Sequence, residues 1–264
     1  ALMWNISPKQ NNAEPLVRNA ATPVGGFQKV DLPDGSVVSL NTASAVEVAF
    51  SATERRVQLT RGEANFAVAK DELRPFVVRV GEVDVRAVGT VFSIRREANS
   101  VEVLVTEGKV RVNDIASGQS LVVAGQAGAD RQSVDSTNES SALTSTVSAE
   151  NPVLTAGQRL TVFTVPDATK VADIDVLAPE EVARKLAWQN RRVEFDLEPL
   201  EHIVAEFNRY NRHQLVIADP RLANRRFGGK FPAGDFDSFV RSLEATFGVV
   251  AERSENETLL RLRP

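Results

Sequence analysis

Closely spaced short stretches of alternating apolar and polar residues constrain the fold of this chain more than any other feature. Between residues 24 and 128 they follow one another with little helical periodicity: VSLNTASAVEVAF, RRVQLT, ANFAVA, FVVRV, VDVRAV, VFSIRR, SVEVLVTEG, KVRV and SLVVAG. Strands at this spacing, separated by turn residues such as Pro33-Asp34-Gly35, indicate a sandwich, a barrel or a coil of β-turns. We therefore expect an all-β domain over residues 24–128.

A different pattern begins near residue 179, where helical and strand periodicities alternate. The stretch PEEVARKLAW (179–188) predicts a helix, with proline in its first turn and acidic residues directly after it. Residues 191–263 then predict the order strand, helix, strand, strand, helix, strand, strand, with helices that begin after Pro199 and after Asp235. This order describes a small α+β domain over residues 179–264.

Three further stretches flank or join these domains. Residues 1–23 are largely polar and predict an extended lead-in, and their apolar start (residues 1–4) suggests the remnant of a removed membrane segment. Residues 129–153 are rich in serine and threonine, which predicts a linker or a long loop. Residues 154–178 predict transitional strands before the α+β domain.

Composition excludes several classes of function. The 264 residues carry a net charge of −4 and include no cysteine, so disulfides, thiolate catalysis and cysteine zinc sites are excluded. Without an overall basic field, we expect no nucleic-acid partner. His202 and His213 lack zinc-protease spacing, and the aspartates occur at turns and caps rather than in an EF-hand loop. We therefore expect no metal and no cofactor.

The segment VRAVGTVFSI (85–94) has strand composition, but Gly89 interrupts it and Thr90 follows with a hydroxyl group. A threonine hydroxyl can attack the carbonyl carbon of the preceding peptide bond, in an N→O acyl shift whose ester product water can cleave. Glycine permits the strained backbone that such a reaction needs. The alternative is a β-bulge that redirects the strand, which spacing alone favours.

Several motifs in a fixed order resemble the FecR-type transmembrane anti-sigma regulators of Gram-negative bacteria. They are TPVGGFQKV (22–30), LPDGSVVSLNTAS (32–44), RRVQLTRGEANFAVAKDELRPFVV (55–78), VGTVFSI (88–94), VEVLVTEGKVRV (101–112) and TAGQRL (155–160). Residues 186–210 and 225–249 are similar to the C-terminal end of that family, and to the STN module of secretins and TonB-dependent transducers. The resemblance implies a FecR-like β domain followed by an STN-like α+β domain.

The same resemblance implies a periplasmic signalling region, anchored to the inner membrane in the full-length protein. Its expected partner is the N-terminal signalling domain of a TonB-dependent outer-membrane transducer, which relays occupancy by a ferric siderophore. The other expected partners are periplasmic proteases and a sigma factor. The sigma factor is expected to bind a cytoplasmic part that lies outside this chain. The resemblance implies no enzymatic activity apart from a single self-cleavage, which some members undergo at the position occupied here by Gly89 and Thr90.

For a partner-binding surface, the sequence offers the last predicted strand, residues 258–263. A terminal strand can present an open edge for strand addition, and its alternation places Leu259, Arg261 and Arg263 on one face. The alternative is an ordinary edge strand protected by its arginines. A carbohydrate-binding β domain joined to a secretin-type module is a further alternative, disfavoured because residues 24–128 contain no Trp or Tyr.

Overall fold

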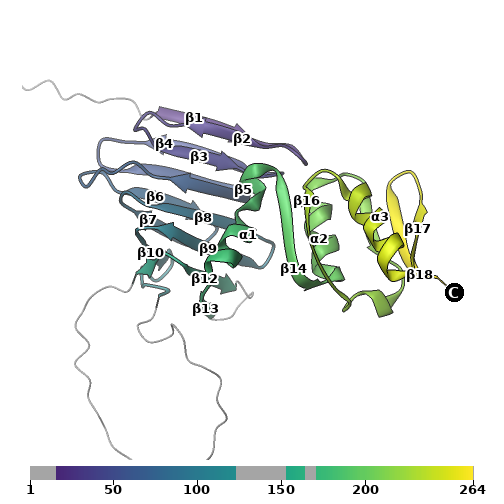
Figure 1. The fold of residues 1–264 in the computed structure, drawn as a ribbon. Coiled ribbons are helices and arrows are strands. Elements are labelled where there is room, and N and C mark those ends of the chain that lie inside the picture. Colours follow the sequence, from purple (N-terminus) through teal and green to yellow (C-terminus); the bar gives the residue numbers. More distant parts are fainter. Residues whose placement is uncertain (1–15, 123–152, 164–170, 264) are drawn as a thin grey trace, which may run out of the picture.

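The computed structural model describes residues 16–122, 153–163 and 171–263. Most of its ordered elements are strands, and thirteen of them form one curled sheet beside a smaller, helix-containing C-terminal region (Figure 1). The sheet comprises β1 (Leu16–Ala21), β2 (Gln28–Asp31), β3 (Val37–Leu40), β4 (Ala45–Phe50), β5 (Arg55–Ala67), β6 (Phe76–Val80), β7 (Val83–Ala87), β8 (Val91–Arg96), β9 (Ser100–Glu107), β10 (Lys109–Asp114), β11 (Leu154–Thr155), β12 (Gln158–Phe163) and β13 (Val171–Val176). We refer to these thirteen strands as the β region.

The long strand β5 makes the sheet curl, because its two halves pair with different neighbours. Its first half pairs with β4 and β6, and its second half, from residue 62 onward, pairs with β3 and β8. Gly62 lies at the junction with φ +78°, and a Cβ there would be only 2.3 Å from Ser44 Oγ. The strands fold over a core whose largest members, Phe66, Phe76 and Phe92, are fully buried.

The β region extends beyond the predicted boundaries at both ends. β1 lies within the predicted lead-in and pairs antiparallel with β4. The predicted transitional strands belong to the same sheet, since β12 pairs with β9, and Leu160 and Val162 join its core. The boundary expected at residue 128 is therefore wrong, because pairing continues to Val176. Residues 1–15 of the lead-in and residues 129–152 of the predicted linker lie outside the described residues.

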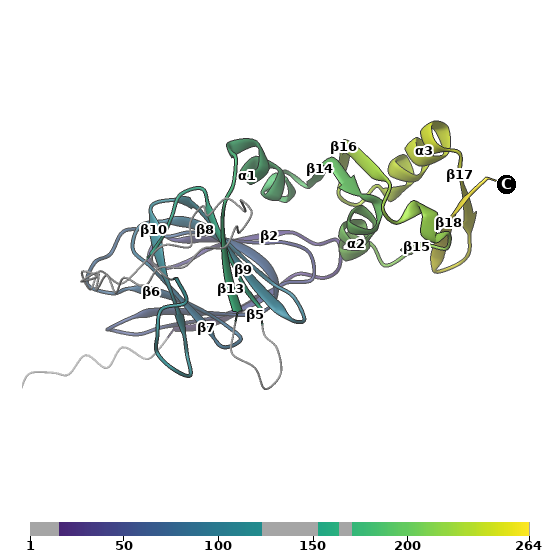
Figure 2. The same cartoon turned by 90° about the horizontal axis from the view of Figure 1, so that it is seen from below.

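The C-terminal region has a second hydrophobic core, and the order of its elements after residue 191 is the predicted one. Helices α2 and α3 lie between a two-stranded sheet, β14–β16, and a three-stranded sheet in the order β15–β18–β17 (Figure 1, Figure 2). Its elements are α1 (Pro179–Lys185), the 3-10 helix η1 (Ala187–Asn190), β14 (Arg192–Pro199), α2 (Leu200–Tyr210), β15 (Gln214–Ile217), the 3-10 helix η2 (Pro220–Leu222), β16 (Arg226–Pro232), α3 (Phe236–Phe247), β17 (Val249–Arg253) and β18 (Glu257–Leu262).

Local chemistry sets the ends of α3 as the sequence predicts. The side chain of Asp235 accepts a hydrogen bond from the backbone N–H of Ser238 at 3.0 Å, which caps the N-terminus. Gly248 ends the helix in the left-handed conformation, with φ +63°. Among the described helices, none is long and apolar enough to cross a membrane.

Candidate functional site

Gly89 and Thr90 lie in the turn between β7 and β8, not inside one continuous strand as residues 85–94 suggest. Gly89 has φ +64°, and a Cβ added there would lie 3.2 Å from the Cβ of Lys70. A change of register between Val91 and Phe92, where β8 pairs with β9, places a β-bulge directly after the turn. The positive-φ glycine and the bulge are therefore neighbours rather than alternatives.

The side chain of Thr90 is buried without a hydrogen-bond partner. Thr90 is 3% exposed, and its carbonyl accepts a hydrogen bond from the backbone N–H of Val68 at 2.9 Å. Its Oγ1 has no partner among the described residues, which is unusual for a buried hydroxyl group. The nearby cation of Lys70 is exposed and pairs with Glu72 at 3.0 Å. Thr90 thus places a hydroxyl group directly after a glycine of positive φ, and no described side chain binds that hydroxyl group.

The predicted partner edge at the last strand is wrong. β18 is the central strand of its sheet, parallel to β15 on one side and antiparallel to β17 on the other. Both of its backbone edges are paired, so it cannot accept another strand. The predicted alternation of faces is confirmed, because Leu260 is fully buried, Arg261 and Arg263 are exposed, and Leu259 is half-buried.

A cluster of four charged side chains joins the β region to α2, and the sequence analysis did not identify it. Glu63 on β5 and Arg95 on β8 are cross-strand neighbours, and α2 presents Glu206 and Arg209 to them. Arg209 donates through Nη2 to Glu63 Oε2 and through Nη1 to Glu206 Oε1, both at 2.7 Å. Arg95 Nη1 donates to Glu206 Oε2 at 3.0 Å. We call these four residues the charged cluster.

Neutral groups complete the same contact. The side-chain amide of Asn41 donates to Glu63 Oε2 at 2.8 Å and to the hydroxyl group of Tyr210 at 2.9 Å. Thr42 Oγ1 donates to the last-turn carbonyl of α2 at 3.0 Å. Phe27 stacks on the Tyr210 ring with centroids 5.9 Å apart. The end of α2 is therefore held by charge, hydrogen bonds and aromatic packing together.

Electrostatics keep the charged cluster ionised. Burial alone would raise the pKa of Glu206, but the charges of Arg209 and Arg95 hold that pKa below its ordinary value. Burial also opposes the charged form of Arg209, yet Glu206 and Glu63 raise its pKa. Burial, with these two carboxylates nearby, raises the pKa of Tyr210, so its phenol stays protonated. The cluster is a row of four charges of alternating sign, joined by three ion pairs.

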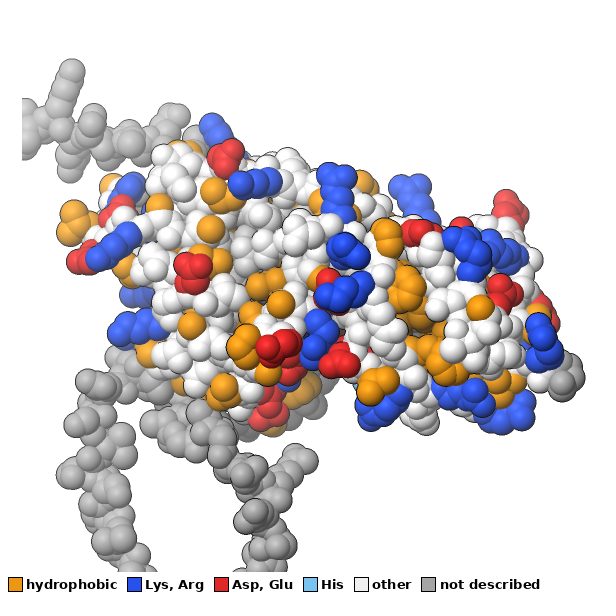
Figure 3. All heavy atoms as spheres, viewed as in Figure 1, with side chains coloured by type: hydrophobic (Ala, Val, Ile, Leu, Met, Phe, Trp, Pro, Cys, Tyr) orange, Lys and Arg blue, Asp and Glu red, His pale blue; other side chains and the backbone are white. Residues whose placement is uncertain are grey.

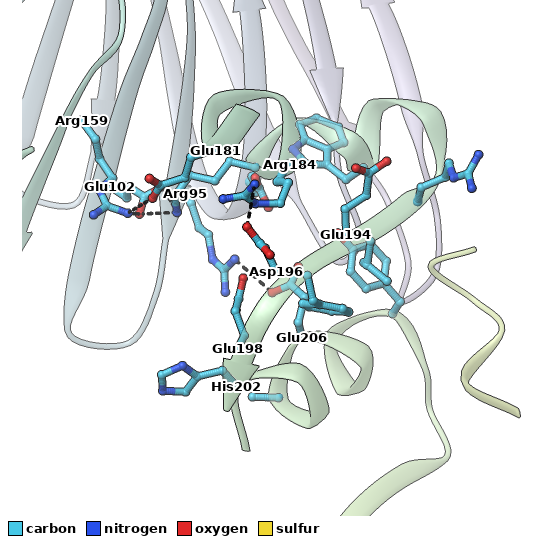
Figure 4. Close-up of a pocket in the computed structure, with 18 of the residues that line it drawn as sticks. Arg95, Glu102, Arg159, Glu181, Arg184, Glu194, Asp196, Glu198, His202 and Glu206 are labelled. Atoms are coloured by element: carbon cyan, nitrogen blue, oxygen red, sulfur yellow. Dashed lines mark hydrogen bonds and ion pairs between the residues drawn. The ribbon is translucent and has the colours of Figure 1, made fainter. Parts of the chain in front are cut away.

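A cavity of about 660 Å³ opens beside the charged cluster, between the β region and the C-terminal region (Figure 4). Eight of the side chains that line it are acidic and five are basic. Figure 3 shows acidic and basic side chains gathered where the two regions meet. Lys185 Nζ on α1 donates to Glu102 on β9 at 3.0 Å, so a further ion pair crosses between the regions. Arg184 on α1 and Asp196 on β14 point toward each other at 3.4 Å.

The fold and this contact define a mostly β protein with a helix-containing C-terminal region, joined through ion pairs beside a charged cavity. The family model described as "FecR protein" matches residues 18–111. This match confirms the resemblance drawn from the sequence motifs over residues 18–111, and the motif at residues 155–160 and the C-terminal stretches lie outside it. Among curated proteins, no sequence matches the chain.

Solved structures share the fold along almost the whole chain. Two crystal structures of a "putative anti-sigma factor" from Parabacteroides distasonis ATCC 8503, at 2.50 and 1.65 Å resolution, superpose with a TM-score of 0.64 each. They are 20% and 19% identical to this chain, and the match covers 94% of this chain and 100% of theirs. At this identity the comparison establishes the architecture, including the presence of both regions.

Proposed function

We propose that this chain is the periplasmic sensing region of a FecR-type anti-sigma regulator. It binds the N-terminal signalling domain of a TonB-dependent transducer and relays siderophore occupancy toward release of a sigma factor, with periplasmic proteases acting between the two events. The observation that carries the proposal is the FecR match at residues 18–111. The fold shared with a protein described as an anti-sigma factor supports it.

The contact between the two regions supports a relay in physical terms. Interfaces built from polar and charged groups resemble transient protein contacts more than a continuous apolar core. The charged cluster and the Lys185–Glu102 pair are such a contact. A buried ion pair opens at low cost only when another charged group replaces the lost partner, and a charged partner surface can provide such a group. A partner that binds beside this contact can therefore change how the regions are joined.

Calorimetry tests the proposed function directly. The chain is titrated with the N-terminal signalling domains of TonB-dependent transducers from the same genome, and an STN-containing N-terminal domain of a secretin serves as the matched control. We expect one transducer domain to bind at about 10 μM or tighter, which corresponds to roughly −7 kcal/mol. Absence of heat and of co-elution for every transducer domain would reject the proposal.

The buried, unpartnered hydroxyl of Thr90 favours a second activity, and we propose a single self-cleavage there. Thr90 Oγ1 bonds to the carbonyl carbon of Gly89, the hydroxyl proton passes to the amide nitrogen, and the C–N bond breaks. The products are an ester between the two residues and a free amine on Thr90. Water then hydrolyses the ester, which leaves a carboxylate on Gly89 and restores the hydroxyl group. Gly89 has φ +64°, a conformation that glycine adopts readily, and this places the bond before Thr90 in a tight turn.

Mass spectrometry of the denatured protein tests the cleavage. We expect two fragments, one that ends at Gly89 and one that begins at Thr90. Hydroxylamine should trap the ester as a hydroxamate on Gly89. Thr90→Ala should abolish the fragments and Thr90→Ser should retain them. Thr106→Ala is the matched control, because Thr106 Oγ1 bonds the Val91 carbonyl at 3.0 Å nearby. A single full-length species that hydroxylamine leaves intact would reject this activity.

A further inference from the structure

Strand β14 has one unpaired backbone edge. Among the described strands it pairs only with β16, in a two-stranded antiparallel sheet. The carbonyl of Arg191 accepts a hydrogen bond from the backbone N–H of Ala233 at 3.0 Å, which fixes the alternation of this ladder. Backbone groups of Val193 and Phe195 therefore point toward β16, and those of residues 192, 194 and 196 point toward the opposite edge.

This free edge borders the charged cavity. Residues 192–196 all line the cavity, without a gap in the run. A strand that showed only one face would contribute alternate residues, so five consecutive lining residues indicate that the edge itself faces the cavity. β8, β9 and β12 line the far side, and α1 and α2 line the remaining walls (Figure 4). A strand placed against β14 would therefore be enclosed by both regions.

The composition of the walls specifies the chemistry of an occupant. Acidic lining residues exceed basic ones by eight to five. Two of the acids, Glu63 and Glu194, pair with Arg209 and Lys230 outside the lining, which leaves a net charge of −1 with histidine neutral. The ion pairs of the described residues do not include Glu198, which lines the cavity. Trp188 also lines the cavity, is 4% exposed, and has an indole Nε1–H without a partner in the described chain. These groups suit lysine or arginine side chains and a backbone carbonyl group.

We propose that the free edge of β14 binds an extended, lysine- or arginine-bearing strand of a partner protein, which completes a three-stranded sheet with β14 and β16. Backbone hydrogen bonds to residues 192, 194 and 196 provide affinity, and the acidic walls select the side chains. The cavity volume of about 660 Å³ lies within the usual range of binding sites, about 300–1,000 Å³. If the partner is the transducer domain, the assignment rests on the proposed function, but the chemistry does not require it.

Hydrogen exchange measured by NMR on the full chain tests the strand. The first probe is the peptide acetyl-TKVKVT-amide, with acetyl-TEVEVT-amide as the charge control and a peptide N-methylated at alternate residues as the backbone control. The second probe is the transducer signalling domain. We expect at least one of the two probes to slow exchange at residues 192, 194 and 196 about tenfold, while Val193 and Phe195, already bonded to β16, stay unchanged. The two control peptides should leave all five amides unchanged.

A pair of variants at one position separates the backbone from the side chain. Glu194→Pro removes an edge N–H that β16 does not use, and Glu194→Ala removes the carboxylate but keeps that N–H. We expect Glu194→Pro to weaken binding of the protecting probe at least about tenfold more than Glu194→Ala, the effect of one backbone hydrogen bond. Unchanged exchange at Val193 and Phe195 in the free variant shows that the sheet is intact.

The outcomes for the two proposals are distinguishable. If the transducer domain binds and neither probe gives alternating protection, the proposed function stands and the strand inference is overturned. If the peptide gives alternating protection and no transducer domain binds, the strand inference stands and the proposed function fails. The strand inference is also overturned if neither probe slows exchange at residues 192, 194 and 196. It is likewise overturned if Glu194→Pro and Glu194→Ala bind the protecting probe with equal affinity.

Discussion

Replacing Arg209 with methionine removes the cation that contacts both acids of the charged cluster. The methionine side chain keeps the aliphatic stem, so packing changes little. Glu63 is left with the neutral amide of Asn41, and Glu206 is left with Arg95 alone. Glu63 has a side-chain exposure of only 7%, so water cannot replace the lost partner easily.

The expected magnitude follows from this geometry. Hydrogen bonds to charged groups contribute about 1.5–3 kcal/mol each, and breaking a buried pair on one side costs about 3–5 kcal/mol. Arg209 retains 22% side-chain exposure, so solvent screening reduces the upper figure. We therefore expect Arg209→Met to lower the free energy of unfolding of the C-terminal region by about 2–4 kcal/mol. Arg221→Met is the matched control: the Arg221 side chain is 74% exposed in its pair with Asp219, so its loss should cost far less than the loss of Arg209.

Urea unfolding followed by the fluorescence of Trp188 measures the change. The chain has two tryptophans, so Trp4→Phe in every variant leaves Trp188 as the reporter. With a slope of about 1–1.5 kcal/mol/M, the midpoint should fall by about 2 M. Adding Glu63→Gln to Arg209→Met should recover about 1–2 kcal/mol, because it removes the uncompensated carboxylate. An Arg209→Met midpoint equal to that of Arg221→Met would refute the role of the charged cluster in joining the regions.

Three further changes test other contacts. Glu206 has a depressed pKa, so its stabilising contribution is present above pH 4.5, the ordinary pKa of glutamate, and is lost as pH falls below that value. Glu206→Gln should therefore weaken the pH dependence of the urea midpoint below pH 4.5, and an unchanged dependence would contradict the shift. Arg55 is fully buried against Asp34, so Arg55→Met should lower the free energy of unfolding by about 3–5 kcal/mol, measured by thermal unfolding followed by circular dichroism. A loss below about 1 kcal/mol, the value of an exposed pair, would contradict its burial. Gly62→Ala should lower the thermal midpoint more than Gly81→Ala, because both have positive φ but only Gly62 lacks room for a Cβ; equal losses would contradict the close approach.

Strand periodicity predicted most of the β region because its strands have one face in the core. β4 is an example, since AVEVAF alternates between buried valine or phenylalanine and more exposed residues. β1, with the sequence LVRNAA, lacks such a pattern and is a strand because it pairs with β4, about 30 residues further along the chain. Pairing of this kind depends on the assembled sheet and cannot be inferred from a local window.

The strand edge was predicted wrongly because the last strand in sequence is not the last strand in space. β18 enters between β15 and β17, and one of these pairings is parallel. Parallel neighbours need a crossover, whose path depends on how α3 packs rather than on the residues of the strand itself. A free edge belongs instead to β14, the first strand of this region.

The charged cluster was missed for a related reason. Glu63 and Arg95 occupy positions on strands where a solvated side chain would fit equally well, and Glu206 and Arg209 have the spacing of an ordinary helical ion pair. Arg95 and Glu206 are separated by 111 residues in the sequence. Only the docking of α2 against β5 and β8 makes these four charges a single cluster.

Strand β8 connects the two candidate sites physically. It begins directly after Thr90, and near its other end Arg95 contacts Glu206 on α2. While the bond between Gly89 and Thr90 is intact, β8 is held covalently to β7 as well as by pairing with β5 and β9. Once the bond is cut, only the pairing and the buried side chains of β8 hold it in the sheet. Cleavage would therefore lower the barrier to movement of β8 while leaving the folded structure unchanged. A partner strand bound at β14 would act on the same contact between β8 and α2 from the other side.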